Sequence, residues 1–281
     1  MTDAAPPRRI WLCADDYGLS PGVNRAIRDL IERGRLNATS VMVVGPAIGR
    51  DEISTLRTAA TNSPRCSIGL HVTLTAPFRP LTMHFQPLDG GMFLAFPKLL
   101  RAGLLRRLDP EIIHAELMVQ LSAFNEMFGR APDFVDGHQH AQLFPGVRDA
   151  FLTAVKEAAP NAWVRQGGRN QPLARLFGAP KALFLDILSA QFRRRASRAN
   201  IPFNPGFAGA YDFSQQPDFS ILMQRFLDGL PEGGLVMCHP GFVDETLVSL
   251  DPLTDQREHE YAFLRGERFA PLLAANKVTL S

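Results

Sequence analysis

The feature that most constrains this chain is the alternation of short apolar runs with amphipathic helical stretches. Residues 9–14 (RIWLCA) form an apolar run that ends at Asp-Asp-Tyr-Gly, which is typical of a buried parallel strand. Ser20-Pro21 then begins a helix, because serine caps a helix N-terminus and proline suits its first position. Apolar runs return at 39–44 and 67–75. This order predicts an α/β fold with a parallel sheet.

Two long stretches interrupt this pattern. Residues 76–108 are rich in proline, glycine and phenylalanine, and residues 167–210 are irregular and basic. Elsewhere the pattern predicts further helices and strands, at 110–128, 134–138, 145–158, 162–164, 218–227, 234–238, 258–264, 269–275 and 278–280. Because no internal repeat is visible, residues 1–281 are predicted to form one barrel-like β/α domain. Residues 1–8 are predicted to be a loose tail and the two stretches to be insertions.

Composition and charge argue against several classes of protein. Of the 281 residues, 46% are hydrophobic, which is enough for a core without disulfides or a structural metal. A formal net charge of +2 is too close to balance to predict nucleic acid as a partner. No run reaches the roughly 18 apolar residues of a membrane span. The N-terminal residues also lack the pattern of a signal peptide.

The cysteines predict a reducing, cytoplasmic location. Cys13, Cys66 and Cys238 lie far apart and form no Cys-x-x-Cys pair, so neither a disulfide framework nor a zinc ribbon is indicated. Cys13 and Cys238 lie inside apolar runs, where a free cysteine behaves as a small buried hydrophobic residue.

Acidic and histidine side chains follow several of the predicted strands at the points where those strands end. They are Asp15 and Asp16 after the first strand, His71 in the third, His138 and His140 after the strand at 134–138, and His239 after the late strand. In β/α barrels, reactive groups gather at the carboxyl ends of the strands. One carboxylate and two imidazoles can hold a divalent ion while leaving positions open for water and substrate. The pattern therefore predicts a catalytic metal site.

The two neighbouring aspartates are predicted to have different roles. Neighbouring residues on an extended chain point to opposite sides, so Asp15 and Asp16 are not both expected to be ligands. One would bind the ion and the other would act as a base on a water molecule, kept anionic by a nearby basic residue. His239 follows a different strand. The ordinary pKa of a histidine suits an acid that protonates a leaving amine.

Each of these signals also has an ordinary structural explanation. Asp-Asp before glycine is common in turns, His71 alone is more often a hydrogen-bonding residue than a ligand, and His239 before proline suits a turn. The pair His138 and His140 is a sharper signal because residues two apart on a strand share a face. Even there, one histidine can serve only to orient the other.

Four motifs together resemble a known family. They are ADDYG at 14–18, IGLHVTLT at 68–75, VDGHQH at 135–140 and VMCHPGF at 236–242. In this order, over residues 9–243, they resemble the YdjC-like carbohydrate deacetylases, which include chitooligosaccharide deacetylase and the hopanoid-associated deacetylases.

The resemblance implies a distorted (β/α) barrel of the glycoside hydrolase and deacetylase type that removes an N-acetyl group from an amino sugar. It implies one divalent ion, Mg²⁺ or Zn²⁺, on Asp16, His71 and His138, with Asp15 as base and His239 as acid. Residues His140, Asp136 and Tyr17 are assigned to supporting the ligands or contacting substrate. One departure is visible, because chitooligosaccharide deacetylases usually extend the third motif with a further histidine, whereas Ala141 follows His140 here.

Two other functions remain as alternatives. The first is a different barrel metal hydrolase, such as a phosphoesterase or a hydrolase of cyclic amides. Those sites often hold two metal ions and place a His-x-His pair on the first strand, whereas here that pair lies mid-chain. The second alternative is a non-catalytic carbohydrate binder that keeps the fold.

The substrate is predicted from residues 92–108 (MFLAFPKLLRAGLLRRL) and from the basic run ending at Arg195. These stretches combine apolar and cationic side chains, which either cover the barrel mouth or lie on a membrane surface. The second interpretation predicts a lipid-linked amino sugar as substrate and a peripheral membrane contact. A homodimer is left open by the sequence.

Overall fold

Seven parallel strands form a curled sheet at the centre of the protein. The computed structural model describes residues 6–62, 66–169, 180–213 and 217–280. The strand order is β8-β7-β4-β3-β2-β10-β9, and every neighbouring pair is parallel. The strands are β2 (Trp11–Tyr17), β3 (Ala38–Val41), β4 (Ser67–Val72), β7 (Phe134–Gly137), β8 (Trp163–Val164), β9 (Phe207–Ala208) and β10 (Leu235–Cys238).

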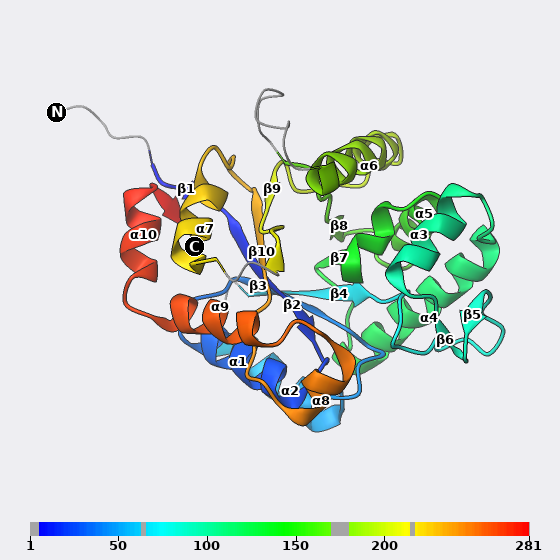
Figure 1. Cartoon of the computed structure of the whole chain (residues 1–281), viewed down its shortest axis with the longest axis horizontal. Helices are drawn as coiled ribbons and strands as arrows, with labels where there is room; N and C mark the ends of the chain where they lie inside the picture. The colour runs from blue at the N-terminus through cyan, green and yellow to red at the C-terminus, as the bar shows by residue number, and fades with distance from the viewer. Residues whose placement is uncertain (1–5, 63–65, 170–179, 214–216, 281) are drawn as a thin grey trace.

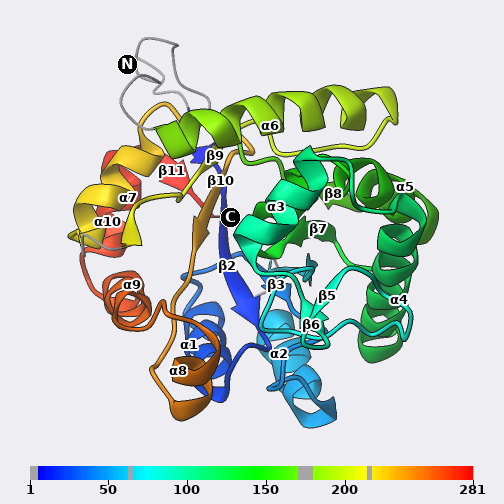
Figure 2. The same ribbon diagram turned by 45° about the vertical axis from the view of Figure 1, so that its right-hand side comes forward.

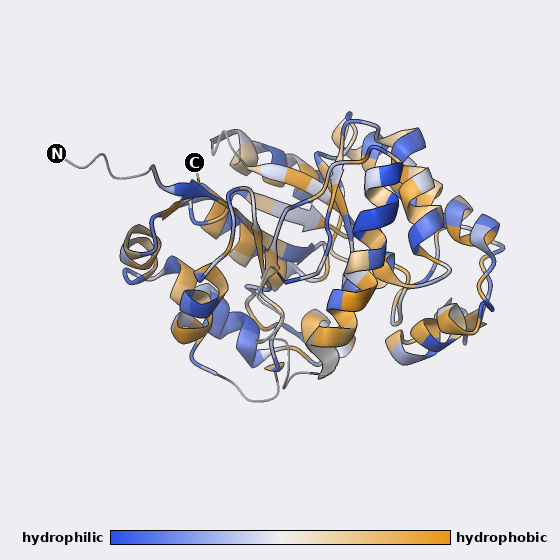
Figure 3. Ribbon diagram, turned by 90° about the horizontal axis from the view of Figure 1, so that it is seen from above, coloured by the Kyte–Doolittle hydropathy of each residue, from blue (hydrophilic) through white to orange (hydrophobic). Residues whose placement is uncertain are grey.

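Helices lie around this sheet (Figures 1 and 2) and carry both hydrophobic and hydrophilic residues (Figure 3). They include α1 (Pro21–Glu32), α2 (Arg50–Asn62), α4 (Pro110–Phe128), α5 (Arg148–Ala158), α6 (Pro180–Arg198), α7 (Phe219–Leu227), α9 (Asp255–Arg265) and α10 (Phe269–Ala275). Helix α4 coincides with the predicted range 110–128. Asp109 caps it by accepting a hydrogen bond from the backbone N–H of Glu111, and Gly129 ends it with a left-handed φ of 67°.

The two edges of the curled sheet meet through the chain that precedes β9. Val164 of β8 forms a parallel bridge with Phe203, and its N–H donates to the carbonyl of Pro202 at 2.8 Å. The Asn204 side chain adds hydrogen bonds to both backbone groups of Gln166, at 2.9 and 3.2 Å. These contacts close the sheet, and the prediction of a distorted β/α barrel is confirmed.

The interior of the barrel has an apolar layer below a polar one. Cys13, Ala38, Phe134, Phe207, Leu235 and Met237 form the buried apolar layer, with Trp11 and Trp163 packed against it. Phe134 stacks on Trp163 with ring centroids 4.6 Å apart, and Gly69 leaves room for the Phe134 ring. Because side chains alternate along a strand, the next inward positions, such as Asp15 after Cys13, form the polar layer above.

The short elements adjust three sequence predictions. Arg8 lies in β1 (Arg8–Arg9), which pairs with β11 (Val278–Thr279), so the part of the expected tail that the structure describes is anchored at Arg8. The rest of that tail, residues 1–5, lies outside the described residues. The insertion at 76–108 contains β5 (Leu88–Asp89), β6 (Met92–Phe93) and α3 (Phe96–Leu104). The insertion at 167–210 contains α6 and β9, and its residues 170–179 are not described.

Cys13 and Cys238 lie inside the strands β2 and β10, as their apolar surroundings predicted. Cys13 and Cys238 are buried free thiols, and Cys66 is free and half-buried. Across the described residues, no helix combines the length and the hydropathy needed to cross a membrane.

Candidate metal centre

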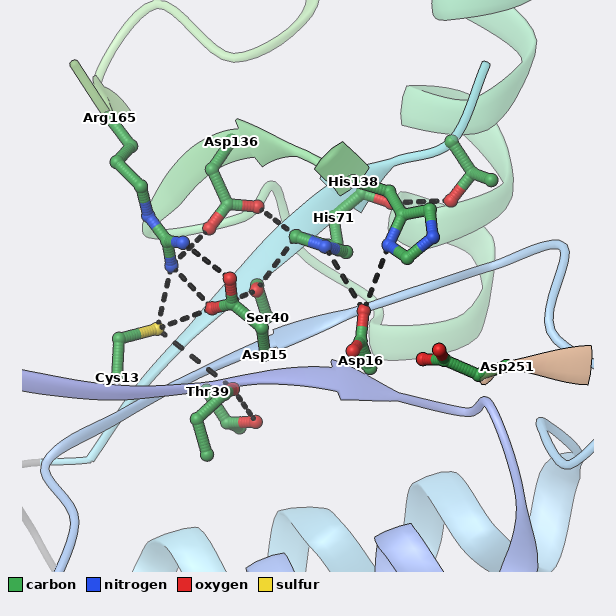
Figure 4. A network of polar contacts seen from close by, with 12 residues as sticks. Cys13, Asp15, Asp16, Thr39, Ser40, His71, Asp136, His138, Arg165 and Asp251 are labelled. Carbon is green, nitrogen blue, oxygen red and sulfur yellow. Dashed lines mark hydrogen bonds and ion pairs between the residues drawn. The ribbon is translucent and has the colours of Figure 1, made fainter. Parts of the chain in front are cut away.

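Asp16, His71 and His138 converge at the carboxyl ends of β2, β4 and β7 (Figure 4). Oδ1 of Asp16 lies 3.0 Å from Nδ1 of His138 and 3.3 Å from Nε2 of His71. One oxygen and two nitrogens therefore form a group whose donor atoms all lie within 4.8 Å of one another. Asp16 and His71 are almost fully buried, whereas His138 is 9% exposed. The group is therefore least buried on the His138 side.

A local distortion of β2 turns Asp16 toward the two histidines. The pairing of β2 with β3 shifts register between Ala14 and Tyr17, and Asp16 has a φ of 70°. This left-handed conformation is costly for most residues, but aspartate tolerates it comparatively well. Because of it, Asp15 and Asp16 do not simply alternate, and both carboxylates lie close to His71. The expectation that neighbours point to opposite sides therefore does not apply here.

His71 is oriented from behind by Asp136 and Ser40. Its Nδ1 donates to Oδ1 of Asp136 at 2.6 Å and lies 3.1 Å from Oγ of Ser40. Asp136 therefore fixes a proton on Nδ1, which leaves Nε2 as the atom that faces Asp16 and that could bind an ion in exchange for its own proton, as in carboxylate-oriented metal-binding histidines. Burial lowers the pKa of His71, but the nearby Asp136 and Asp15 carboxylates outweigh burial and raise that pKa to about 10. The surroundings thus favour a positive charge at this point, which fits a site for a cation.

Asp15 is bound by a buried arginine that the sequence analysis did not single out. Arg165 donates from Nη1 to Oδ2 of Asp15 at 2.5 Å and from Nη2 to Oδ1 at 2.6 Å. Its Nη2 also forms an ion pair with Oδ2 of Asp136 at 2.5 Å. Burial raises the pKa of Asp15, but Arg165 and His71 outweigh burial and lower it to about 2. Asp15 is therefore anionic, as expected of a base supported by a basic residue.

The same arginine removes a second candidate metal site. Cys13, Asp15 and Asp136 also lie close enough to hold an ion. The Arg165 guanidinium contacts all three, with Nη2 3.0 Å from the Cys13 sulfur. One signal in the sequence could have found Arg165, because it directly follows the strand predicted at 162–164.

A second buried arginine contacts the proposed ligand Asp16. Arg257 of α9 is fully buried and donates from Nη2 to Oδ2 of Asp16 at 2.7 Å and to Oδ2 of Asp251 at 2.6 Å. Burial raises the pKa of Asp16, but Arg257 and His138 outweigh burial and hold it well below its usual value. No motif or strand end indicated Arg257 in the sequence.

His239 follows β10 and borders the same polar layer. Burial lowers the pKa of His239, and its Nδ1 is buried without a hydrogen-bond partner among the described residues. Its backbone N–H donates to Oε2 of Glu260 at 2.6 Å, and the Tyr211 hydroxyl donates to Oε1 of the same carboxyl at 2.5 Å. Burial raises the pKa of Glu260 to about 7. The Phe213 ring contacts His239 edge to face, with centroids 5.6 Å apart.

The remaining predicted site residues have different surroundings. Asp136 lies directly behind His71, as described above. His140 has a left-handed φ of 58°, its ring meets Phe207 edge to face, and burial lowers its pKa to about 3. Tyr17 is buried with its hydroxyl bonded to Glu52 and Arg28. The Tyr17 hydroxyl is therefore engaged by those two residues, whereas His140 stays beside the polar layer.

Part of the insertion at 76–108 packs against the metal-centre residues. Phe78 meets the His138 ring edge to face, with centroids 5.9 Å apart. The buried carboxylate of Glu116 on α4 accepts hydrogen bonds from the backbone N–H groups of Leu81 and Thr82, at 3.0 and 2.9 Å. Helix α4 thereby holds the insertion beside the site.

The protein is thus a distorted β/α barrel with an Asp-His-His group that could hold a metal ion at the carboxyl ends of its strands. The chain belongs to the YdjC-like protein family, whose model matches residues 9–275. The resemblance seen in the four motifs is therefore confirmed.

Solved structures show the same fold. A protein of Enterococcus faecalis V583, proposed to cleave cellobiose phosphate, is similar with a TM-score of 0.75 and 18% identity over 98% of this chain and 97% of that chain. The lactam utilization protein of Thermus thermophilus is similar with a TM-score of 0.50 and 17% identity over 97% and 98% of the two chains. A family 4 carbohydrate esterase from Streptomyces lividans has a TM-score of 0.44 and 11% identity over 98% and 92%. The first two likenesses establish the fold.

Proposed function

We propose that this chain hydrolyses the N-acetyl group of an amino sugar, using one divalent ion, Mg²⁺ or Zn²⁺, held by Asp16, His71 and His138. The observation that carries the proposal is the meeting of this donor group with an anionic Asp15 and with His239 at one barrel mouth. The four-motif resemblance and membership of the YdjC-like family support the choice of substrate class. Bound there, a divalent ion would polarise the acetyl carbonyl and lower the pKa of a water molecule.

Asp15 supplies the base in this proposal. Its carboxylate is held by both Nη atoms of Arg165 and has a pKa of about 2, so it is ionised throughout the neutral range. It accepts a proton from the attacking water, whose oxygen bonds to the acetyl carbon. Arg165 fixes the orientation of Asp15 while the charge on that carboxylate changes.

His239 supplies the acid. When the C–N bond breaks, its imidazolium gives a proton to the departing nitrogen, so that acetate and a free amino sugar result. Glu260 holds the backbone of His239, and Phe213 contacts its ring. Since burial lowers the pKa of His239, this step is expected to slow as pH rises through a value below about 6.5.

The single-ion proposal is favoured over a two-metal hydrolase. Cys13, Asp15 and Asp136 form the second group that could hold an ion, but the Arg165 guanidinium already occupies the space between them. A second ion there would have to displace a buried cation that contacts all three residues, at a large electrostatic cost.

The test measures metal content and acetate release together. His71→Ala and His138→Ala should each lose bound metal and reduce acetate release from N-acetylglucosamine oligomers by at least about a hundredfold. His114→Ala is the control, because His114 lies at the surface with Glu157 as its partner. Acetate release that survives either ligand change would contradict the ligand assignment. Two tightly bound ions per chain would favour a two-metal hydrolase, and sugar binding without turnover would favour a binder.

A further inference from the structure

The two oxygens of Asp16 have different partners. Oδ1 faces His138 and His71, at 3.0 and 3.3 Å. Oδ2 accepts a hydrogen bond from Arg257 Nη2 at 2.7 Å. The carboxylate is thus divided between the donor group and a fully buried guanidinium.

Arg257 is itself fixed by two further contacts. Nη2 also donates to Oδ2 of Asp251 at 2.6 Å, and Nε donates to the carbonyl of Leu253 at 3.0 Å. Figure 4 shows Asp251 pointing toward Asp16. Withdrawing Oδ2 from Arg257 would leave this buried cation with fewer acceptors, which is costly because charge-assisted hydrogen bonds are strong in a dry interior.

A carboxylate can bind a metal ion through one oxygen or through both. Calcium takes six to eight oxygen ligands and often binds carboxylates through both oxygens. Zinc is held by about four ligands and accepts a single carboxylate oxygen beside histidines. An aspartate whose second oxygen is already bound therefore suits the second kind of ion.

We propose that Arg257 is a positioning residue that restricts Asp16 to one-oxygen coordination and so makes the centre prefer small divalent ions to calcium. This inference rests on the proposed metal site. Asp251 and the Leu253 carbonyl hold Arg257 in place, and α9, which carries none of the four sequence motifs, thereby sets the ion preference. The left-handed backbone at Asp16 supports the same arrangement, because it directs Oδ1 toward the histidines.

The experiment measures the affinities of the metal-free protein for Zn²⁺ and Ca²⁺ by competition with chromogenic chelators. In Arg257→Gln we expect the preference for Zn²⁺ over Ca²⁺ to fall by about tenfold, because Oδ2 becomes available. Losing a positive charge alone raises both affinities alike, since both ions carry the same charge, so the ratio isolates the coordination effect. Arg148→Gln is the control, because it removes a mostly buried guanidinium of α5 whose charge interacts with Arg195 and Asp149 and which is no part of the candidate metal centre. Its ratio should stay within about twofold of the original.

Arg257→Lys is the second variant, and it keeps the inference testable if Arg257→Gln does not fold. Lysine keeps the charge but cannot contact Asp16, Asp251 and Leu253 with the same fixed fork, so the ratio should fall by about threefold. A ratio unchanged in the folded Arg257 variants, with only stability reduced, would show that Arg257 is a structural ion pair and overturn this inference alone. If the unsubstituted protein binds neither ion, the proposed metal site fails as well.

Discussion

At the scale of single residues, the site depends on two buried arginines that hold two neighbouring aspartates. Arg165 binds both oxygens of Asp15, and Arg257 binds one oxygen of Asp16. Each arginine offsets the tendency of burial to protonate its aspartate. The proposed base and the proposed ligand are therefore both kept anionic, although they are adjacent in the sequence.

Removing Arg165 should change the pH dependence of the reaction. The pKa of Asp15 is lowered from 3.8 to about 2, so its contribution to stability is complete above pH 3.8 and is lost as pH falls through 2. In Arg165→Met, burial dominates and the pKa of Asp15 rises. We expect an acid limb of kcat/KM to enter the range from pH 4 to 8, in which Asp15 of the unsubstituted chain stays ionised. A limb at the original position would contradict the role of Arg165.

Glu260 should make stability fall as pH rises. Its pKa is raised from 4.5 to about 7, so the contribution of the neutral carboxyl is complete below pH 4.5 and is lost as pH rises through 7. In Glu260→Gln the side chain stays neutral, and between pH 5 and 8 the variant should gain up to about 3 kcal/mol relative to the original chain. Urea unfolding at both pH values measures this difference, and parallel stability curves would show that Glu260 does not ionise in this range.

At the scale of elements, helix α3 presents apolar and basic residues beside the site. Gly103 allows α3 to approach the Pro145 carbonyl, which a Cβ atom would meet at 2.2 Å. The exposed residues at the end of the helix are Leu104, Leu105, Arg106 and Arg107. This combination is typical of segments that bind anionic lipid surfaces. The membrane contact expected from residues 92–108 therefore stays a prediction, and these four residues are the surface on which it can be tested.

Liposome flotation tests that surface. We expect the protein to float with vesicles containing anionic lipid, and Leu104→Ser with Leu105→Ser to reduce the floating fraction severalfold. The control is Ile221→Ser with Val248→Ser, which removes a similarly exposed apolar pair elsewhere. Equal loss in both double variants, or no flotation of the unsubstituted protein, would count against a membrane contact of α3.

At the scale of the whole molecule, barrel closure depends on a polar seam between β8 and the chain before β9. Asn204 accepts from the N–H of Gln166 and donates to the carbonyls of Gln166 and Gly206. Gln166 directly follows Arg165 in the chain. Closing the barrel at Gln166 therefore also positions Arg165, which binds Asp15.

Asn204→Ala should therefore affect both stability and the site. Leaving the buried N–H of Gln166 without a partner should cost about 1–3 kcal/mol in the free energy of unfolding, measured by urea denaturation. We also expect lower activity, because Arg165 loses support. Ser197→Ala, at an exposed position near the end of α6, is the control and should change stability by less than about 0.5 kcal/mol. A fully stable Asn204→Ala protein would show that the seam is not needed for closure.

Features that depend on local pattern could be predicted from the amino-acid sequence. The alternation of apolar runs and helices predicted the barrel, the Asp-Pro start and Gly129 stop predicted α4, and strand ends predicted Asp15, Asp16, His71, His138 and His239 at one mouth. The fold predictions are confirmed because strand and helix periodicity act over a few residues. The roles of the five site residues stay predictions, which rest on the meeting of parallel strand ends at one edge.

The pairing of the buried charges could not be predicted from the sequence, because it depends on long-range packing. Arg165 lies 150 residues from Asp15, and Arg257 lies 241 residues from Asp16. No periodicity links positions so far apart, and their contacts depend on how the sheet curls and where α9 packs. The left-handed backbone conformation of Asp16 could not be predicted from the sequence either, because its conformational cost is offset by contacts with distant elements. Long-range packing of buried charges thus fixes the orientation of the candidate ligands.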